Sequence, residues 1–366
     1  MGIVMKSLKV GLDLGHNCTK ITDDCGQSSM VESRVRLGSV NVISADGDTA
    51  AGLTVLSDQN GNKYTVGKIT DFQKLNPDEF ATSQIAAALA NYAILNHLKT
   101  SKHRRFEDIT GQLTVFVCTA IPFGRYFNKD GSVNIELIEK VKENLEQPIE
   151  IEVSPGKTIQ FKLKVVVKSQ TQIAYFSHVF YDEQKPNKPA NQRTLKMFDD
   201  RASESVALID LGGGTSDVVS INELQQIEID KSGSLNIGSN TLSEELTKLI
   251  CKHLKIEFIK HKEIDRALTC NQVKLGKQLI DVSHLVDEAY KQIGQQILTF
   301  LKNRLGNTDS IDTISFFGGF SKDEKIKEQI KGNLRSSFSD NEVWLEDPQF
   351  ENSKALSMFC RFKHSW

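Results

Sequence analysis

The chain contains one short pattern twice, and this repeat constrains its fold more than any other feature. Residues 10–21 read VGLDLGHNCTKI, and residues 207–219 read ALIDLGGGTSDVV. Each copy leads an apolar run into Asp-Leu-Gly, continues through polar or small residues, and returns to apolar residues. Two apolar runs around a glycine turn are typical of a β-hairpin. A repeat at this separation predicts two similar domains, each built around one hairpin.

Strand-like and helix-like segments alternate along the rest of the chain. Apolar runs rich in β-branched residues predict strands, whereas apolar residues at helical spacing predict helices. The main predicted strands are 113–122 and 162–168, and the main predicted helices are 82–98, 132–144, 169–182 and 281–304. This alternation predicts an α/β fold whose strands are buried on both faces.

The chain length of 366 residues suits two domains. We predict that domain I comprises residues 1–167 and 345–366, with a smaller inserted subdomain at about residues 26–100, and that domain II comprises residues 168–344. The stretch from Glu183 to Arg193 contains two prolines and few apolar residues. This composition predicts an exposed loop, to which we assign no role.

The charge balance and the cysteine pattern argue against several classes of protein. Lys and Arg total 45 against 47 Asp and Glu, so no broad basic surface is expected for direct binding of nucleic acid. The six cysteines have no C-x-x-C spacing, which favours reduced thiols in the cytoplasm. No apolar run reaches the roughly 18–20 residues that a membrane-spanning helix needs. We expect a cytoplasmic protein without direct contact to nucleic acid or membrane.

The glycine turns of the two hairpins suit the binding of phosphate. A turn without β-carbons lets successive backbone N–H groups converge on an anion. The candidate residues are Gly15, Asn17, Cys18, Thr19 and Lys20 in the first copy, and Gly212, Gly213, Gly214 and Thr215 in the second. A single Asp-x-Gly turn is more often a plain turn, but two copies in matching contexts favour a shared polyphosphate held from both sides.

The aspartate in each copy would repel a phosphate unless a cation lies between them. Mg²⁺ typically bridges phosphates to one or two carboxylates and keeps several waters. We therefore predict that Asp13 and Asp210 hold Mg²⁺, largely through water. Lys20 adds a positive charge that could stabilise a β-phosphate as a γ-phosphate leaves.

Further glycines precede predicted helices and complete the candidate site. The segment FFGGF, Phe316–Phe320, places Gly318 and Gly319 at a strand-to-helix turn, where the backbone can approach a base and ribose closely. Taken alone, this pair is equally consistent with a plain tight turn. Gly238 stands before a predicted helix with Ser and Thr in its first turn and is a further candidate.

Three segments together resemble the actin-fold ATPases, the superfamily of actin, DnaK-type chaperones and sugar kinases. Leu8–Asp24 resembles the first phosphate motif, Ala207–Ile221 the second, and Ile314–Ser321 the adenosine motif. The resemblance implies a two-domain, actin-like (ribonuclease H-like) α/β fold in which duplicated mixed sheets flank a nucleotide cleft. It also implies ATP as the nucleotide, with GTP as an alternative, together with Mg²⁺.

Other segments resemble ParM/StbA, the plasmid-segregation actins. Cys118–Leu145 is similar to the region of that family in which a C-T-x-P strand end is followed by an aromatic-rich turn and a basic helix. Lys168–Phe176 and the ending DPQFENSKALSMF are also similar to that family. The first hairpin departs from the superfamily pattern, because His16 and Cys18 replace small hydroxyl residues. This departure leaves contacts by those side chains open, whereas contacts from the backbone would remain.

The resemblance assigns catalytic roles to two polar residues. Gln170 stands where ParM-type proteins often have Glu and actin has Gln, which implies that it orients the attacking water while the terminal phosphate accepts the proton. Asp217 is implied to orient the same water. The alternative is that both residues have purely structural roles, Gln170 as a polar helix cap and Asp217 as a residue at the end of a strand.

The implied function is a filament-forming ATPase that stacks head to tail and segregates plasmid DNA through a DNA-bound adaptor protein. A monomeric small-molecule kinase of the same fold would need a base and a substrate pocket, and the sequence shows no clear candidate for either. A cell-shape or cell-division actin homologue is a further alternative, for which the aromatic and basic C-terminal helix could contact a membrane. We expect that helix to cover the core of domain I instead.

Overall fold

The computed structural model describes residues 5–39, 53–67, 69, 72, 77–101, 109–154, 156–183, 194–198, 200–331, 333–334 and 342–362. The chain divides into two compact units. Unit 1 is Met1–Ala202 with Phe350–Trp366, and unit 2 is Ser203–Gln349. The domain limits predicted from the sequence, after residues 167 and 344, differ from these divisions and stay predictions. The predicted loop Glu183–Arg193 lies outside the described residues except for Glu183.

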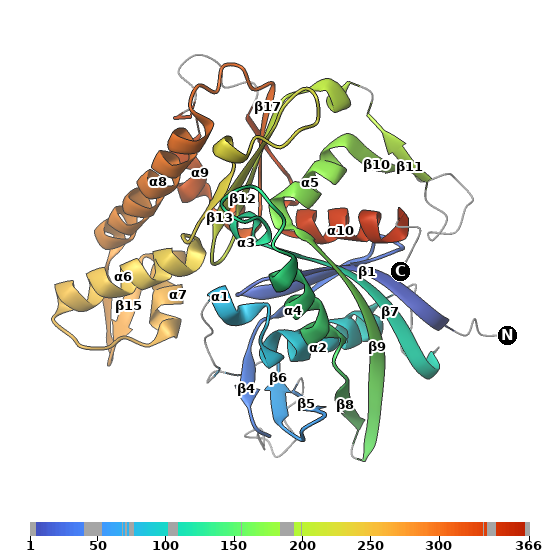
Figure 1. Cartoon of the computed structure of the whole chain (residues 1–366). Helices are drawn as coiled ribbons and strands as arrows, with labels where there is room; N and C mark the ends of the chain where they lie inside the picture. Colours follow the sequence, from blue (N-terminus) through green and yellow to red (C-terminus); the bar gives the residue numbers. More distant parts are fainter. Residues whose placement is uncertain are drawn as a thin grey trace. The chain divides into compact units, whose positions relative to one another are not determined.

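Unit 1 is a mixed sheet with helices packed on it (Figure 1). Its strands are β1 (Met5–Leu14), β2 (Cys18–Asp23), β3 (Ser28–Glu32), β4 (Val35–Leu37), β5 (Thr54–Asp58), β6 (Lys63–Val66), β7 (Ile109–Ile121), β8 (Ile149–Ser154), β9 (Lys157–Ser169), β10 (Phe180–Glu183) and β11 (Thr194–Met197). Its helices are α1 (Pro77–Phe80), α2 (Gln84–Thr100), α3 (Phe123–Tyr126), α4 (Ile135–Glu146), α5 (Gln170–Val179) and α10 (Glu351–Phe362).

The sheet of unit 1 has the strand order β3-β2-β1-β7-β9-β8-β5-β6-β4. Strands β1, β7 and β9 are parallel, and β2 and β3 extend the sheet as antiparallel neighbours. The long strand β9 pairs with β7 through its second half and with β8 through its first half. The strands of the predicted inserted region therefore join the main sheet through β8 and β9.

Helix α5 is shorter than predicted. The helix expected over residues 169–182 ends at Val179, because Phe180 adopts an extended backbone with φ −116° and ψ 152°. Residues 180–183 then form β10, which pairs with β11. The predicted helix over residues 82–98 is confirmed as α2, whose N-cap Ser83 accepts a hydrogen bond from the Ala86 amide at 3.2 Å.

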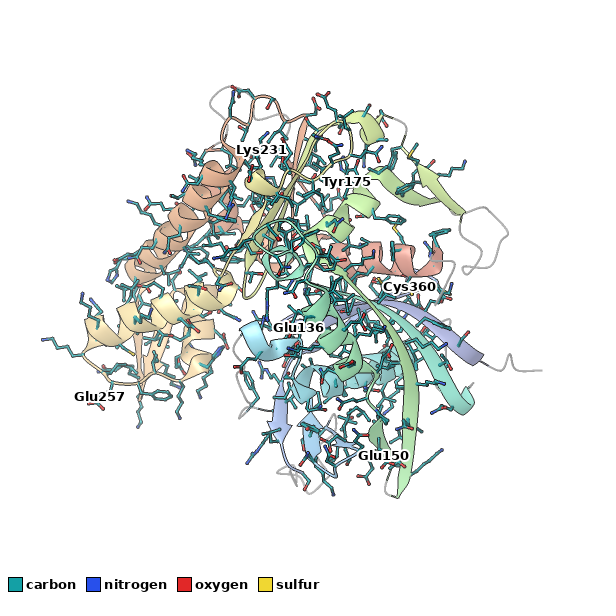
Figure 2. The ribbon with its side chains drawn as sticks, in the orientation of Figure 1. Glu136, Glu150, Tyr175, Lys231, Glu257 and Cys360 are labelled. Carbon is teal, nitrogen blue, oxygen red and sulfur yellow. The ribbon has the colours of Figure 1, made fainter. Side chains whose placement is uncertain are left out.

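The last described helix packs on the first strand. Figure 1 shows α10 alongside β1, although the two elements come from opposite ends of the chain. Gly11 permits this approach, because a β-carbon there would collide with the α10 backbone at Ser353 and Ser357. Cys360 of α10, labelled in Figure 2, donates to the Phe116 carbonyl at 3.3 Å, and burial raises its pKa to about 12. These contacts match the expectation that the C-terminal helix covers the core.

Unit 2 repeats the same plan with different covering elements. Its strands are β12 (Val206–Leu211), β13 (Ser216–Ile221), β14 (Gly233–Leu235), β15 (Gln272–Leu275), β16 (Gln278–Asp281), β17 (Thr313–Phe317) and β18 (Glu342–Trp344). Its helices are α6 (Ser239–Leu254), α7 (His261–Cys270), α8 (Ser283–Leu305) and α9 (Glu324–Ile330). The main sheet has the order β14-β13-β12-β17-β18, and β15 and β16 form a separate hairpin.

The two sheets are topologically equivalent over five strands. In unit 1 the order β3-β2-β1-β7-β9 contains two antiparallel pairs followed by two parallel pairs. In unit 2 the order β14-β13-β12-β17-β18 has the same pattern of directions. The predicted duplication is therefore confirmed, with each repeated sequence forming the first hairpin of its sheet.

A search of the described helices for membrane-spanning character finds none with the required length and apolar content.

We expect Gly11→Ala to destabilise the protein, because the added methyl group forces α10 away from β1. The free energy of unfolding should fall by roughly 1–3 kcal/mol or more. Denaturant unfolding followed by circular dichroism measures this change. Gly319→Ala is the control, since no atom lies within 4 Å of a β-carbon there. Equal stability of the two variants would contradict the packing of α10 on Gly11.

Candidate functional site

The first glycine turn joins β1 to β2 at the carboxyl end of β1. Its strands pair Asp13 with Lys20 and Leu14 with Thr19. Gly15 is required by space, because a β-carbon there would lie 2.6 Å from the Cys18 carbonyl oxygen. The Gly15 amide donates to the Asp13 carbonyl at 3.2 Å, which tightens the chain reversal. The chain therefore reverses tightly directly after Asp13.

Ser33 holds this turn from behind, and no pattern in the sequence pointed to it. Its hydroxyl donates to the Gly15 carbonyl at 2.6 Å, and its amide donates to the Asn17 carbonyl at 2.9 Å. The Thr19 hydroxyl lies 3.0 Å from the same Ser33 oxygen. In a trans peptide the N–H points opposite to the C=O, so fixing the Gly15 carbonyl turns the His16 amide away from Ser33. The buried Ser33 thus orients a potential phosphate donor.

Asp13 and Lys20 form an ion pair across the hairpin. The Lys20 Nζ lies 2.9 Å from the Asp13 Oδ2, and the two side chains are only 14% and 5% exposed. Such a pair compensates the charge of a buried carboxylate in the absence of another cation. Thr119 of β7 supports the neighbouring strand β1, because its hydroxyl donates to the Leu12 carbonyl at 2.8 Å.

The two unusual side chains of the first turn, His16 and Cys18, are both partly buried. The His16 ring lies 4.6 Å from the Phe80 ring, measured between centroids. Burial, and secondarily the Arg125 guanidinium, lowers the pKa of His16. Burial also raises the pKa of the Cys18 thiol. Both side chains are therefore held in their neutral forms, whereas Asn17 is exposed.

Gln170 lies at the same edge of the sheet as the first turn. The strand register aligns Leu12 with Thr119, and Ile121 with Ser169, so β1, β7 and β9 all end at this edge. Gln170 is the first residue of α5 and is partly exposed. Carboxyl edges of parallel strands are common places for ligands in α/β sheets. The structure therefore brings Gln170 to the edge that carries Asp13.

Two hydroxyl groups beside Gln170 were not predicted from the sequence. Ser169 and Thr171 are both fully buried. Within the described part of the chain, neither hydroxyl has a hydrogen-bond partner, and Ser169 does not cap α5 through its side chain. Because an unsatisfied buried hydroxyl costs about 1–3 kcal/mol, ordered water is expected beside them.

The second glycine turn is held by the start of α6. The Ser239 and Asn240 amides donate to the Gly212 and Gly213 carbonyls at 3.3 and 2.9 Å. The Gly212 carbonyl shares its peptide group with the Gly213 N–H, and the Gly213 carbonyl shares its peptide group with the Gly214 N–H. Because the N–H and C=O of a trans peptide point in opposite directions, these two N–H groups point away from α6. Among the described residues, neither N–H has a recorded partner. Two adjacent donors with this orientation form the kind of backbone nest that binds an anion.

Gly238 supports the turn from behind. A β-carbon at this position would lie 2.5 Å from the Gly212 oxygen and 2.6 Å from the Gly213 oxygen. The turn and α6 can therefore approach only because residue 238 is glycine. The Gly212 amide closes the turn by donating to the Thr215 carbonyl at 2.9 Å.

Asp217 is buried opposite Asp210 in the register of β12 and β13. It accepts hydrogen bonds from the hydroxyls of Thr215, at 2.8 Å, and Ser234. These bonds tie the end of the turn to β14. The matched position in unit 1 is Lys20, so the cross-strand partner of the aspartate is positive in one unit and acidic in the other.

Asp210 lies against the predicted adenosine motif. Strand β17 pairs with β12 so that Phe317 is beside Asp210. Gly318 follows with φ +90°, and a β-carbon there would collide with the Asp210 Oδ1. Gly319 has open space instead, with no atom within 4 Å of its β-carbon position. Within unit 2 the second turn and the Gly318 turn are therefore neighbours.

We expect His16 to titrate below its ordinary pKa of about 6.5. Its neutral form is favoured in the folded chain, so its contribution to stability is present above that pKa and is lost as the pH falls below it. Histidine ring NMR against pH measures the pKa directly. Arg125→Gln should raise the value only partly, because burial is the larger cause. A His16 pKa at or above 6.5 in the folded protein would contradict this account.

Comparison with known proteins agrees with this architecture. The family model of the archaeal actin homologue MreB-like C-terminal region matches residues 208–335, which lie in unit 2. A search of curated proteins finds no match.

Solved structures match over nearly the full chain. The archaeal actin homologue Ta0583 is 19% identical, with a TM-score of 0.69 over 97% of this chain and 100% of that one, and a second structure of Ta0583 is a complex with ADP. A subunit of a ParM filament from Clostridium botulinum is 17% identical, with a TM-score of 0.71 over 98% of this chain and 99% of that one. ParM of Bacillus thuringiensis with ATP is 14% identical, with a TM-score of 0.61 over 97% and 98% of the two chains.

The predicted resemblance is therefore confirmed at the level of architecture, and ParM proteins are among the structures that share it. The chain has the two-domain, mixed α/β actin-like fold.

Proposed function

We propose that this protein is a nucleotide-driven, filament-forming ATPase. The observation that carries the proposal is the pair of equivalent hairpins, each with a buried aspartate followed by a glycine turn held from behind. The likeness to an ADP complex, an ATP complex and a filament subunit supports nucleotide binding and self-association.

In this proposal both turns bind one MgATP. Amides of the first turn and those of Gly213 and Gly214 hold the phosphates, and Asp13 and Asp210 hold hydrated Mg²⁺. The donor set fits that ion, since carboxylates and water are its preferred ligands. Lys20 then exchanges part of its ion pair with Asp13 for the β-phosphate. The glycine pair at 318 and 319 accommodates the base and ribose; GTP in place of ATP is the alternative.

Hydrolysis in this proposal depends on orientation of water rather than on a strong base. Gln170 is a neutral amide and can align a water for in-line attack on the γ-phosphate. Water bound by the buried hydroxyls of Ser169 and Thr171 would lie beside it. Asp217, whose two hydroxyl donors fix its position, orients the water from the second unit.

The nucleotide state then controls assembly. ATP and ADP can bias the protein only through their different affinities for its conformations, and the γ-phosphate is the difference between them. Head-to-tail contacts do not close on themselves and so produce filaments. We propose a cytoplasmic role in plasmid segregation, in which a DNA-bound adaptor protein links the filament to its cargo.

Assembly should require ATP and an intact Asp210. Wild-type protein with MgATP should sediment at high speed, whereas protein with MgADP should stay in the supernatant. Asp210→Asn should lose sedimentation, because its side chain keeps the shape beside Gly318 but loses the charge that holds Mg²⁺. Light scattering follows the same reaction in time.

Phosphate release and nucleotide binding, measured on the same samples, separate loss of assembly from loss of binding. A wild-type protein that binds ATP, stays monomeric at high concentration and phosphorylates a small molecule would replace this proposal with the kinase alternative.

Adjacent glycines should respond differently to a methyl group. Gly318→Ala should destabilise the free protein, because the methyl group meets Asp210. Gly319→Ala should leave stability unchanged and weaken nucleotide binding about 10-fold or more, because only a bound ligand fills the open space there. Calorimetric titration with MgATP, together with thermal unfolding, distinguishes the two effects. If Gly319→Ala binds MgATP with unchanged affinity, the base and ribose do not bind at this turn.

A further inference from the structure

The segment that follows β7 lies beside the first glycine turn and carries a cation, Arg125, to which no sequence motif pointed. Strands β1 and β7 are parallel neighbours, and their register pairs Leu12 with Thr119, two residues before each strand ends. Neighbouring strands lie about 4.8 Å apart. The turn after β1 and helix α3 after β7 therefore begin side by side at the carboxyl edge of the sheet.

The turn and α3 also face the same side of the sheet. Leu14, just before the turn, and Tyr126 of α3 both pack against the core cluster that β1 and β7 share with α2 and α4. Phe80 belongs to this cluster, and the His16 ring of the turn lies 4.6 Å from the Phe80 ring, measured between centroids. The opposite face of β7 packs on α10 through a separate cluster. His16 and α3 therefore lie on one side of the sheet.

Arg125 is held next to this turn by contacts of its backbone. Its amide donates to the Pro122 carbonyl at 3.0 Å, and its carbonyl accepts from the Asn134 side chain at 3.2 Å. Arg125 is partly buried, and its guanidinium lowers the pKa of His16 after the larger effect of burial. The cation is therefore close enough to the first turn to act on a group there.

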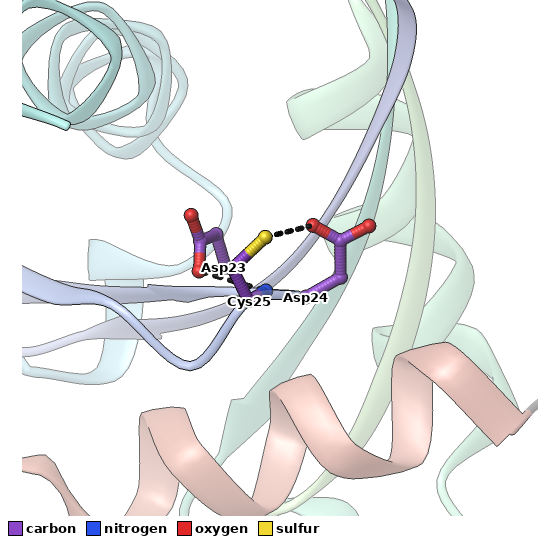
Figure 3. Close-up of side chains that lie close together, drawn as sticks. All are labelled: Asp23, Asp24 and Cys25. Carbon is purple, nitrogen blue, oxygen red and sulfur yellow. Dashed lines mark hydrogen bonds between the residues drawn. The ribbon is translucent and has the colours of Figure 1, made fainter. Parts of the chain in front are cut away.

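The carboxylates at the two ends of the first hairpin are compensated in different ways. At the end distant from the turn, the Asp23 Oδ1 accepts from the Cys25 amide at 3.0 Å, as Figure 3 shows. At the turn, the Lys20 Nζ lies 2.9 Å from the Asp13 Oδ2. Because this ion pair is neutral overall, it gives the turn little net attraction for a polyanion. Arg125 supplies the positive charge that the pair does not.

The neighbours of α3 indicate which phosphate this charge would meet. Helix α3 contacts α5, whose first residue is Gln170. In the proposed function, Gln170 aligns the water that attacks the γ-phosphate, whereas Lys20 contacts the β-phosphate. A cation on α3 therefore lies beside the residue that is assigned to the γ-phosphate.

We propose that Arg125 binds the terminal phosphate of a nucleoside triphosphate at the first turn, so that the protein distinguishes the triphosphate from the diphosphate. This role rests on the proposed nucleotide site. The planar guanidinium has five N–H donors, and its fork matches two oxygens of one phosphate. ADP lacks the terminal phosphate, so the contact is made with ATP alone. It supplies the differential affinity that a nucleotide-controlled assembly requires.

Nucleotide affinities of the full chain test this role without measuring hydrolysis. Displacement of a fluorescent ADP analogue, with the protein too dilute to assemble, gives the Kd of the β,γ-imido analogue of ATP and of ADP, each with Mg²⁺. Wild type should bind the triphosphate analogue at least about 10-fold more tightly than ADP. Arg125→Gln should weaken triphosphate binding about 10–100-fold and ADP binding less than about 3-fold.

Two further variants separate the guanidinium from charge and from folding. Arg125→Lys keeps the charge and loses the fork, so its preference for the triphosphate should lie between those of wild type and Arg125→Gln. Lys129→Gln is the matched control, because it removes one positive charge from an exposed position further along the same segment, and it should keep both affinities. Circular dichroism establishes that each variant is folded; if Arg125→Gln is not, Arg125→Lys decides by the same ratio of affinities.

The outcomes distinguish this role from the ATPase proposal. If wild type binds nucleotide, the role of Arg125 is overturned when wild type binds both nucleotides equally, or when the folded Arg125 variant loses affinity for both equally or for neither. The nucleotide site itself then stands. If wild type binds neither nucleotide, the ATPase proposal is overturned, and the role of Arg125 with it.

Discussion

The direction of a few peptide groups is the constraint on which both candidate phosphate turns depend. A carbonyl held from behind forces the N–H of the same peptide to the other side. In unit 1 the holding group is the Ser33 side chain, and in unit 2 it is the first turn of α6. The two units therefore use different contacts for the same purpose, which is to orient the His16 amide in unit 1 and the Gly213 and Gly214 amides in unit 2, each in the turn that follows a buried aspartate. Glycine is needed at residue 15 because a β-carbon there would meet the Cys18 carbonyl, and at residue 238 because a β-carbon there would meet the Gly212 and Gly213 carbonyls.

The duplicated hairpins differ in charge at one matched position. Lys20 faces Asp13 across the first hairpin, whereas Asp217 faces Asp210 across the second. A lysine beside one aspartate suits contact with a phosphate, and a second carboxylate suits the orientation of water. In the proposed ATPase both residues would be used, so the duplicated fold would serve two chemical roles.

The sequence predicted the elements whose formation depends mainly on residues close together in the chain. The Asp-Leu-Gly repeats identified both hairpins, and helical spacing identified α2 and α8 with small errors at their ends. Ser33 could not be predicted, because its partners Gly15 and Asn17 are distant in sequence and follow no spacing pattern. The hydroxyls of Ser169 and Thr171 could not be predicted either, because their burial depends on tertiary packing. The start of β10 was missed because Phe180 suits helix and strand equally until its pairing with Met197 decides. These features therefore depend on long-range contacts, which the local sequence patterns do not contain.

The central claim is that one nucleotide engages both glycine turns. Hydrogen exchange followed by mass spectrometry, at a protein concentration too low for assembly, tests it with and without saturating MgATP. The account predicts slower exchange of the amides at residues 15–19 and at residues 212–215 with the same dependence on nucleotide concentration. Slower exchange at one turn alone, or at neither, would contradict it.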